Sequence, residues 1–129
     1  MAHIWVDLQV VPAIHDEQIA EHGGASGVRD RGLLESALAR PQNLAAYGDP
    51  DIAELATAYA HAISRNHPFV DGNKRTAWVA AETFVQLNGA EIDADDASVY
   101  PAMFALAAGR LEEKEFAAWL RARLKLLKA

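Results

Sequence analysis

The chain has 129 residues, of which 51% are hydrophobic and 23% charged, with a formal net charge of −6 and no cysteine. This composition predicts one soluble globular domain and excludes disulfides, thiolate nucleophiles and cysteine-based zinc sites. The acidic balance argues against direct nucleic-acid binding. No apolar run approaches the roughly 18 residues of a membrane span. The N-terminus lacks the basic and apolar regions of a signal peptide, so a cytoplasmic location without membrane contact is expected.

The N-terminal part predicts one short helix after an apolar segment. Residues 4–8 read as either a short strand or an apolar lead-in. Pro12 suits the first turn of a helix, because its missing N–H has no helical partner there. Ile14 and Ile19 are expected to face inward. The glycine-rich residues 23–27 predict a helix stop followed by a loop.

A second helix is predicted from Asp30, whose side chain can cap the first turn. Its expected inward residues are Leu33, Leu34, Ala37 and Leu38. The helix is expected to end before Pro41, because the residue that precedes a proline disfavours the helical conformation. Residues 42–49 then predict a loop that carries an exposed Tyr47.

Two further helices are predicted to form the central pair. Asp49 would cap the first of them, with Pro50 at its first position and Pro68 beyond its end. Its apolar stripe is Ile52, Leu55, Tyr59 and Ile63. The second follows a turn at residues 71–72 and is closed at residues 88–89. Its expected inward residues are Ala77, Ala81, Phe84 and Leu87.

The C-terminal third predicts two more helices. Acidic residues 93–98 would start the first, with Pro101 either in the first turn or kinking the helix and Gly109 stopping it. From Glu112 an amphipathic pattern predicts a last helix; its apolar residues are Phe116, Trp119, Leu120, Leu124 and Leu127. The predicted fold is an all-α, compact, single-domain helical bundle of about five or six helices over residues 1–129.

The loop between the two central helices concentrates polar residues within a cationic stretch, residues 65–78. Arg65, Lys74 and Arg75 against Asp71 alone give it a net charge of +2 in an acidic chain. Cations beside a glycine and a helix start suit an anionic ligand. A histidine and an aspartate add a possible base and a possible magnesium ligand. The residues alone leave open a connecting loop whose polar groups cap helices.

Residues 67–75, HPFVDGNKR, resemble the signature of the Fic/Doc superfamily, His-x-Phe-x-Asp/Glu-Gly/Ala-Asn-x-Arg. Ile14, His15 and residues 23–24, 29–30, 33–41 and 88–89 are similar to its Doc (death-on-curing) branch. The resemblance implies a compact helical core with the signature between two central helices. It also implies a toxin of a toxin–antitoxin pair that transfers part of a nucleoside triphosphate to a protein hydroxyl.

The resemblance implies roles for individual residues. His67 would be the general base, Asp71 the Mg²⁺ ligand, and Arg75 would complete the catalytic set. A buried Phe69 would anchor the loop so that His67 points outward. The implied nucleotide and phosphate ligands are Arg65, Gly72, Asn73, Lys74 and Arg75. His15 is expected to be buried or capping rather than catalytic.

Two positions bear on which group is transferred. AMP-transferring Fic members have glycine where Lys74 stands and a second arginine where Trp78 stands. The Doc-like pattern favours transfer of the γ-phosphoryl group of ATP, or of another nucleoside triphosphate, to a threonine of elongation factor Tu, which would inhibit translation. Three alternatives stay open: a Fic-type AMP transferase, a catalytically idle binding module and a helix-turn-helix DNA binder, the last disfavoured by the acidic charge.

The resemblance also bears on control. Self-restrained superfamily members carry a helix in which a glutamate is followed by glycine or asparagine, and no glutamate of this chain is so followed. The expectation is therefore an antitoxin in trans, Phd-like, that folds as a helix on binding.

Overall fold

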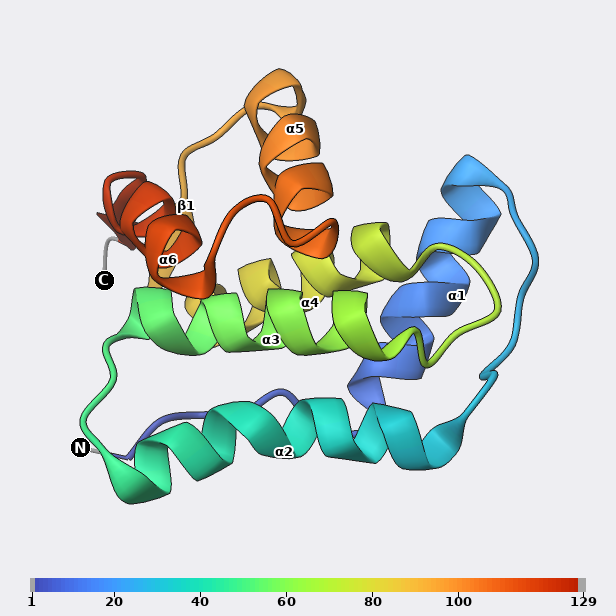
Figure 1. The fold of residues 1–129 in the computed structure, drawn as a ribbon, viewed down its shortest axis with the longest axis horizontal. Coiled ribbons are helices and arrows are strands. Elements are labelled where there is room, and N and C mark those ends of the chain that lie inside the picture. Colours follow the sequence, from blue (N-terminus) through green and yellow to red (C-terminus); the bar gives the residue numbers. More distant parts are fainter. Residues whose placement is uncertain (1, 128–129) are drawn as a thin grey trace.

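Helices build nearly all of the protein in a computed structural model that describes residues 2–127, so the all-α prediction is confirmed (Figure 1). The one sheet of the described residues is a small antiparallel pair of strands. In chain order the elements are α1 Val10–His22, α2 Arg31–Tyr47, α3 Ile52–Asn66, α4 Asn73–Leu87, β1 Ala90–Ile92, α5 Asp96–Ala107, α6 Glu113–Arg121 and β2 Leu124–Leu126.

Helix α3 is the centre of the core. It packs most extensively against α4 and then against α2 and α6, which confirms α3 and α4 as the central pair. In Figure 1, α2 runs beside α3 in the opposite direction, and α5 and α6 lie on its other side. Leu55, Tyr59 and Ile63 are fully buried, as predicted. Buried alanines along α3 and α4 permit the close approach of the two helices.

Helix α2 is longer than predicted. Asp30 caps it, with its side chain accepting from the Leu33 N–H at 3.0 Å, as expected. The predicted end before Pro41 is wrong, because α2 continues to Tyr47. Of the predicted loop at 42–49, residues 42–47 are helical and residues 48–49 are not, and Tyr47 is exposed as predicted. An interior proline costs about 3 kcal/mol, but Pro41 is buried and Ala45 packs on the core. Packing along α3 therefore outweighs the local preference.

The start of α3 also differs from its prediction. The N-cap is Asp51 rather than Asp49, so Pro50 lies before the helix instead of at its first position. The Asp51 side chain accepts from the Glu54 N–H at 2.8 Å, and the Glu54 side chain accepts from the Asp51 N–H at 3.1 Å. This reciprocal capping box satisfies two backbone donors, whereas a cap at Asp49 would satisfy one.

The predicted last helix is too long. Helix α6 ends at Arg121, and Leu124–Leu126 forms β2, antiparallel to β1 at Ala90–Ile92. Leu127 is also outside the helix, and its N–H donates to the Gly89 carbonyl at 3.0 Å. Leu87, predicted to face inward, is exposed near this turn. A helical spacing of leucines cannot reveal a strand partner more than thirty residues upstream, because that pairing is a tertiary contact.

The remaining elements agree with expectation or settle an alternative. Residues 4–6 form an apolar lead-in, not a strand, and the buried Val6 donates its N–H to the Tyr59 hydroxyl at 3.0 Å. Pro12 lies in the first turn of α1. Pro101 lies inside α5, beyond its first turn. No helix within residues 2–127 has the length and apolarity that crossing a bilayer requires.

Candidate functional site

The signature loop connects the C-terminal end of α3 to the start of α4. His67 is the C-cap of α3, with φ 50° and ψ 53°, and its ring is exposed. Among residues 2–127 it is the one non-glycine residue with positive φ. A left-handed residue before a proline is unusual, and such a conformation persists only where the surroundings enforce it.

Arg29 holds the end of α3. Its Nε donates to the His67 carbonyl at 2.7 Å, and its Nη2 donates to the Asn66 carbonyl at 3.0 Å. A cation on the last carbonyls of a helix satisfies them and complements the helix dipole. Arg29 could not be assigned to the site from the sequence, because the two carbonyls are 38 and 37 residues away along the chain.

The segment before α2 lies antiparallel to the signature loop. The N–H groups of Arg29 and Asp30 both donate to the Pro68 carbonyl, at 2.7 and 3.0 Å. Val70 in turn donates its N–H to the Gly27 carbonyl at 3.1 Å. These bonds fix the backbone of the loop over residues 68–70.

Asn73 ties the loop to the first turn of α4. Its Oδ1 accepts from the Phe69 N–H and its Nδ2 donates to the Phe69 carbonyl, both at 3.0 Å. Phe69 is fully buried while His67 stays exposed, the arrangement expected for an anchor beneath the loop. The amide of Asn73 is itself buried. The observed hydrogen bonds of Asn73 hold the loop. The expected contact of Asn73 with phosphate stays a prediction.

His15 of α1 lies against the same loop. Its ring is buried and stacked on the Phe69 ring, with centroids 4.0 Å apart and planes 5° apart. Its Nε2 lies 2.7 Å from the Asp71 carbonyl oxygen, and because a carbonyl can only accept, Nε2 donates. The prediction that His15 is buried is confirmed. The contacts of His15 with residues 69–71 could not be predicted from the sequence alone.

Asp71 presents an exposed carboxylate at the turn. Its Oδ1 accepts from the Gly72 N–H at 2.8 Å, and its Oδ2 accepts from the Ala25 N–H at 3.4 Å. These backbone hydrogen bonds, that of Gly72 first, lower the pKa of the Asp71 carboxyl below its usual range. The group is therefore an anion at neutral pH. Gly24 has φ 118°, a conformation that favours glycine, and a Cβ there would lie 2.7 Å from Asp71 Oδ2 and displace this carboxylate.

Asp71 could bind a magnesium ion if a bound nucleotide supplied further ligands. Within residues 2–127 no group of three or more His, Cys, Asp or Glu side chains could hold a metal by itself. Magnesium at nucleotide sites is typically held by one or two carboxylates together with substrate phosphates and water. A single exposed carboxylate beside an anion-binding loop fits that pattern, with a nucleotide supplying the other ligands.

The start of α4 is suited to phosphate. Its N-cap is Gly72, at φ 71° and without a side chain to accept from the first-turn N–H groups. A Cβ there would approach Ile19 Cδ1 to 3.2 Å and Arg75 Nη2 to 3.3 Å. Lys74 is exposed, and half-buried Arg75 donates from Nη2 to the Gly23 carbonyl at 3.1 Å. Free N–H groups, a positive dipole end and two cations together favour an anion.

Arg65 and Trp78 flank the signature in different ways. Arg65 is exposed in the last turn of α3, and a Cβ on Gly109 would lie 3.6 Å from its Nη1. This places the guanidinium beside the connection between α5 and α6. The half-buried Trp78 packs edge-on against Trp119 of α6, with ring centroids 6.1 Å apart. Trp78 is thus a packing residue between α4 and α6.

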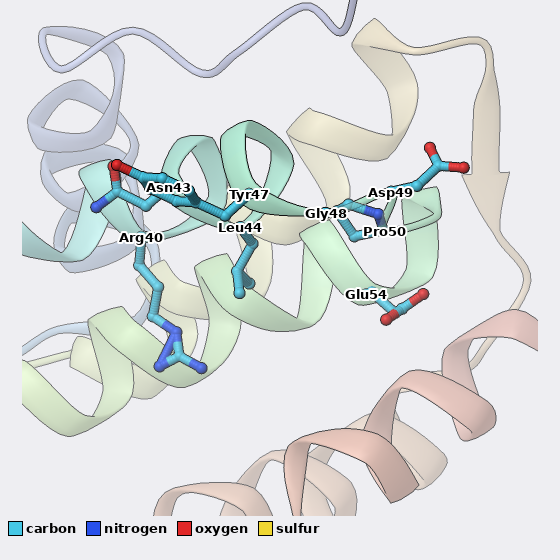
Figure 2. A pocket seen from close by; sticks show the side chains of 8 residues that line it. All are labelled: Arg40, Asn43, Leu44, Tyr47, Gly48, Asp49, Pro50 and Glu54. Carbon is cyan, nitrogen blue, oxygen red and sulfur yellow. The ribbon is translucent and has the colours of Figure 1, made fainter.

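A cavity of about 590 Å³ lies elsewhere in the molecule, where α2 ends and α3 begins (Figure 2). Its lining residues are Arg40, Asn43, Leu44, Tyr47, Gly48, Asp49, Pro50 and Glu54. The signature loop is at the opposite end of α3, a helix about 22 Å long at the usual rise per residue. The cavity shares no residue with the predicted site, and a phosphate that bound at an exposed helix start would not require an enclosed pocket.

The chain is similar to a known protein family and to two known proteins. The model of the Fic/DOC family matches residues 5–85, which include α1 to α3, the signature loop and all but the last two residues of α4. "Toxin Doc" of Mycolicibacterium smegmatis is 50% identical over 76 residues, 57% of this chain and 58% of that protein. "Protein kinase doc" of Escherichia phage P1 is 38% identical over 81 residues, 62% of this chain and 64% of that protein. The match thus spans less than two thirds of either relative.

Proposed function

The chain belongs to the Fic/DOC family, in its Doc branch, and on that premise we propose that it is a toxin of a toxin–antitoxin pair with protein kinase activity. The transferred group would be the γ-phosphoryl of ATP or of another nucleoside triphosphate, and the acceptor a hydroxyl of a target protein. The placement of an exposed histidine, an exposed carboxylate and an uncapped helix start on one loop supports this proposal.

The reaction uses the chain's residues in distinct roles. A ring nitrogen of His67 takes the proton of the attacking hydroxyl, a contribution of roughly 10²–10⁴-fold in rate. The hydroxyl oxygen bonds to the γ-phosphorus as the bond to the bridging oxygen breaks, and the nucleoside diphosphate leaves with that electron pair. The first-turn N–H groups of α4, Lys74 and Arg75 hold the phosphates in line for this displacement.

Asp71 would hold magnesium together with the nucleotide. When bound there, magnesium would supply positive charge that offsets the negative charge developing on the phosphates during transfer. Asp71 itself stays ionised, since the Gly72 and Ala25 N–H groups stabilise its charged form. Asn73 and Arg29 keep the backbone of the loop in place beneath these ligands.

The residue at position 78 favours transfer of a phosphoryl group over transfer of AMP. The position of the second phosphate-binding arginine of AMP-transferring Fic proteins is occupied by Trp78, which packs on Trp119. An indole in that packing offers no cation to a phosphate. Gly72 favours the runner-up, an AMP transferase, because glycine at that place of the signature is the more Fic-like choice.

The target and the partner are proposed from the resemblance. The acceptor would be a threonine of elongation factor Tu, so that translation is inhibited. Restraint would come from a Phd-like antitoxin that folds as a helix on this domain, because the chain has no glutamate in the self-inhibitory pattern.

The test uses ATP labelled separately at the α and γ phosphates. Purified protein is incubated with each label, magnesium and a cell lysate, with the His67→Ala variant as control. We expect a protein band that is labelled from the γ position only and is lost in the variant. A band labelled from the α position would replace the kinase by an AMP transferase. No labelled band from either position would contradict both transfer reactions.

A further inference from the structure

We propose that His15 is a positioning residue of the site, which sets the orientation of the Asp71–Gly72 peptide and thereby of the Asp71 carboxylate. The inference rests on the proposed function only in assigning magnesium and nucleotide to that carboxylate. Its basis is a short hydrogen bond from a buried ring on α1 to a backbone carbonyl on the signature loop, 56 residues away along the chain.

The peptide in question has little intrinsic preference for one orientation. Gly72 lacks a Cβ and populates positive and negative φ with similar ease, so the Asp71–Gly72 peptide plane can rotate at small cost. In the observed orientation the Asp71 carbonyl accepts from His15 Nε2. A rotated peptide would instead turn the Gly72 N–H toward Nε2, and two donors repel as long as the ring keeps its proton on Nε2. In this tautomer His15 therefore selects one of two accessible orientations.

The orientation of the Asp71–Gly72 peptide sets the position of the Asp71 carboxylate through two consecutive hydrogen bonds. With the carbonyl held by His15, the Gly72 N–H points to the other side and donates to Asp71 Oδ1 at 2.8 Å. That bond fixes the side chain of Asp71 relative to the start of α4. Rotation of the peptide would remove this donor and leave the carboxylate with only the longer bond from the Ala25 N–H, at 3.4 Å.

The position of His15 is itself rigid. Its ring is stacked on Phe69 and 1% exposed, so the donor cannot move without disturbing the core. Ile19, one turn further along α1, borders the same turn, since a Cβ on Gly72 would lie 3.2 Å from its Cδ1. The contact therefore couples α1, a separate element, to the predicted metal ligand.

Two substitutions separate the donor from the stacked ring. His15→Phe keeps an aromatic ring against Phe69 and removes the donor, whereas His15→Gln keeps an N–H donor and removes the ring. Tyr59→Phe is the matched control, because it also removes one buried bond between an aromatic side chain and the backbone, that of the Tyr59 hydroxyl with the Val6 N–H. Each protein is titrated with ATP by calorimetry in magnesium and in EDTA, and exchange of the Gly72 amide proton is followed by NMR.

We expect His15→Phe to weaken ATP binding in magnesium by about 10–100-fold, the usual cost of losing a group that orients a metal ligand. Binding in EDTA should not change, and the Gly72 amide should exchange faster. His15→Gln and Tyr59→Phe should resemble the wild type in all three measurements. Unchanged binding in His15→Phe, or equal weakening with and without magnesium, would overturn the proposal.

The remaining outcomes keep this inference separate from the proposed function. If the wild type binds no ATP in either condition, the proposed function fails, and Gly72 exchange decides the role of His15. Faster exchange in His15→Phe but not in Tyr59→Phe then upholds the positioning role, and unchanged exchange refutes it. If His15→Phe does not fold, His15→Gln decides: wild-type behaviour supports the role of the donor, and loss of binding overturns it.

Discussion

The side-chain amide of Asn73 faces the ring of His67, with Nδ2 3.3 Å from Nδ1. The amide cannot be turned around, because its Oδ1 accepts from the Phe69 N–H and its Nδ2 donates to the Phe69 carbonyl. The nitrogen facing His67 can only donate, so Nδ1 must accept. A neutral His67 in this arrangement carries its proton on Nε2. To act as a base through Nε2, the ring must first give up the contact with Asn73.

The first prediction is the resting tautomer of His67. Nitrogen chemical shifts of the imidazole should identify the Nε2–H form as the main neutral species, because Asn73 donates to Nδ1. Asn73→Ala should raise the share of the Nδ1–H form. The same substitution should lower the free energy of unfolding by about 1–3 kcal/mol, since it leaves two buried Phe69 groups without partners. A main Nδ1–H form in the wild type would contradict the assignment.

The second prediction separates the role of His67 in transfer from any role in stability. His67→Ala should abolish transfer to the target and change the free energy of unfolding by no more than about 1 kcal/mol, because the ring is exposed. Denaturant unfolding and γ-label transfer measure the two effects. His67→Asn is the control for backbone conformation, since asparagine tolerates positive φ. Transfer at the wild-type rate in either variant would refute the role of general base.

The third prediction concerns the transferred group. The mass of the modified target should rise by one phosphate, about 80 Da, in keeping with in-line phosphoryl transfer. The double substitution Lys74→Gly and Trp78→Arg should lower phosphorylation and raise the ratio of AMP transfer to phosphorylation, because it introduces the residues of AMP-transferring Fic members. Trp78→Phe is the control, since it keeps an aromatic ring against Trp119. A mass increase of one AMP on the wild-type target would exclude the kinase assignment.

The fourth prediction tests the clamp on the end of α3. Arg29→Met should lower the free energy of unfolding by roughly 1.5–3 kcal/mol, because it removes hydrogen bonds from a charged group to the carbonyls of Asn66 and His67. Arg31→Met is a matched control two residues later. Arg31 makes an exposed pair with Glu35 at 3.4 Å, worth at most about 0.5 kcal/mol. Equal effects of the two substitutions would argue against the clamp.

The fifth prediction is a pH dependence at the start of α3. The Arg121 hydrogen bond, first among several causes, lowers the pKa of Asp51 from its ordinary value of 3.8. A lowered carboxyl pKa in the folded state stabilises the protein above the ordinary value, and this stabilisation is lost as pH falls through the lowered value. Asp51→Asn should therefore reduce the loss of stability on acidification. Asp51→Ala should cost about 1 kcal/mol at neutral pH, because the cap is lost as well.

Local chemistry was sufficient for much of this protein. The cap at Asp30, the buried stripe of α3, the glycine stop of α1 and the turn at residues 71–72 depend on neighbours within a few residues, which a sequence displays directly. The residues of the signature loop are also contiguous. The family could therefore be predicted from the sequence, and the candidate residues of the site could be named, before any fold was known.

Only the tertiary structure decided how those groups are held. The passage of α2 through Pro41 and the pairing of β2 with β1 follow from contacts between distant segments, which override local preference. In the site, His15 reaches the signature loop from α1, and Arg29 reaches it from the segment before α2. The bonds that orient His67 and Asp71 join parts of the chain 38 and 56 residues apart, and only folding makes such parts neighbours.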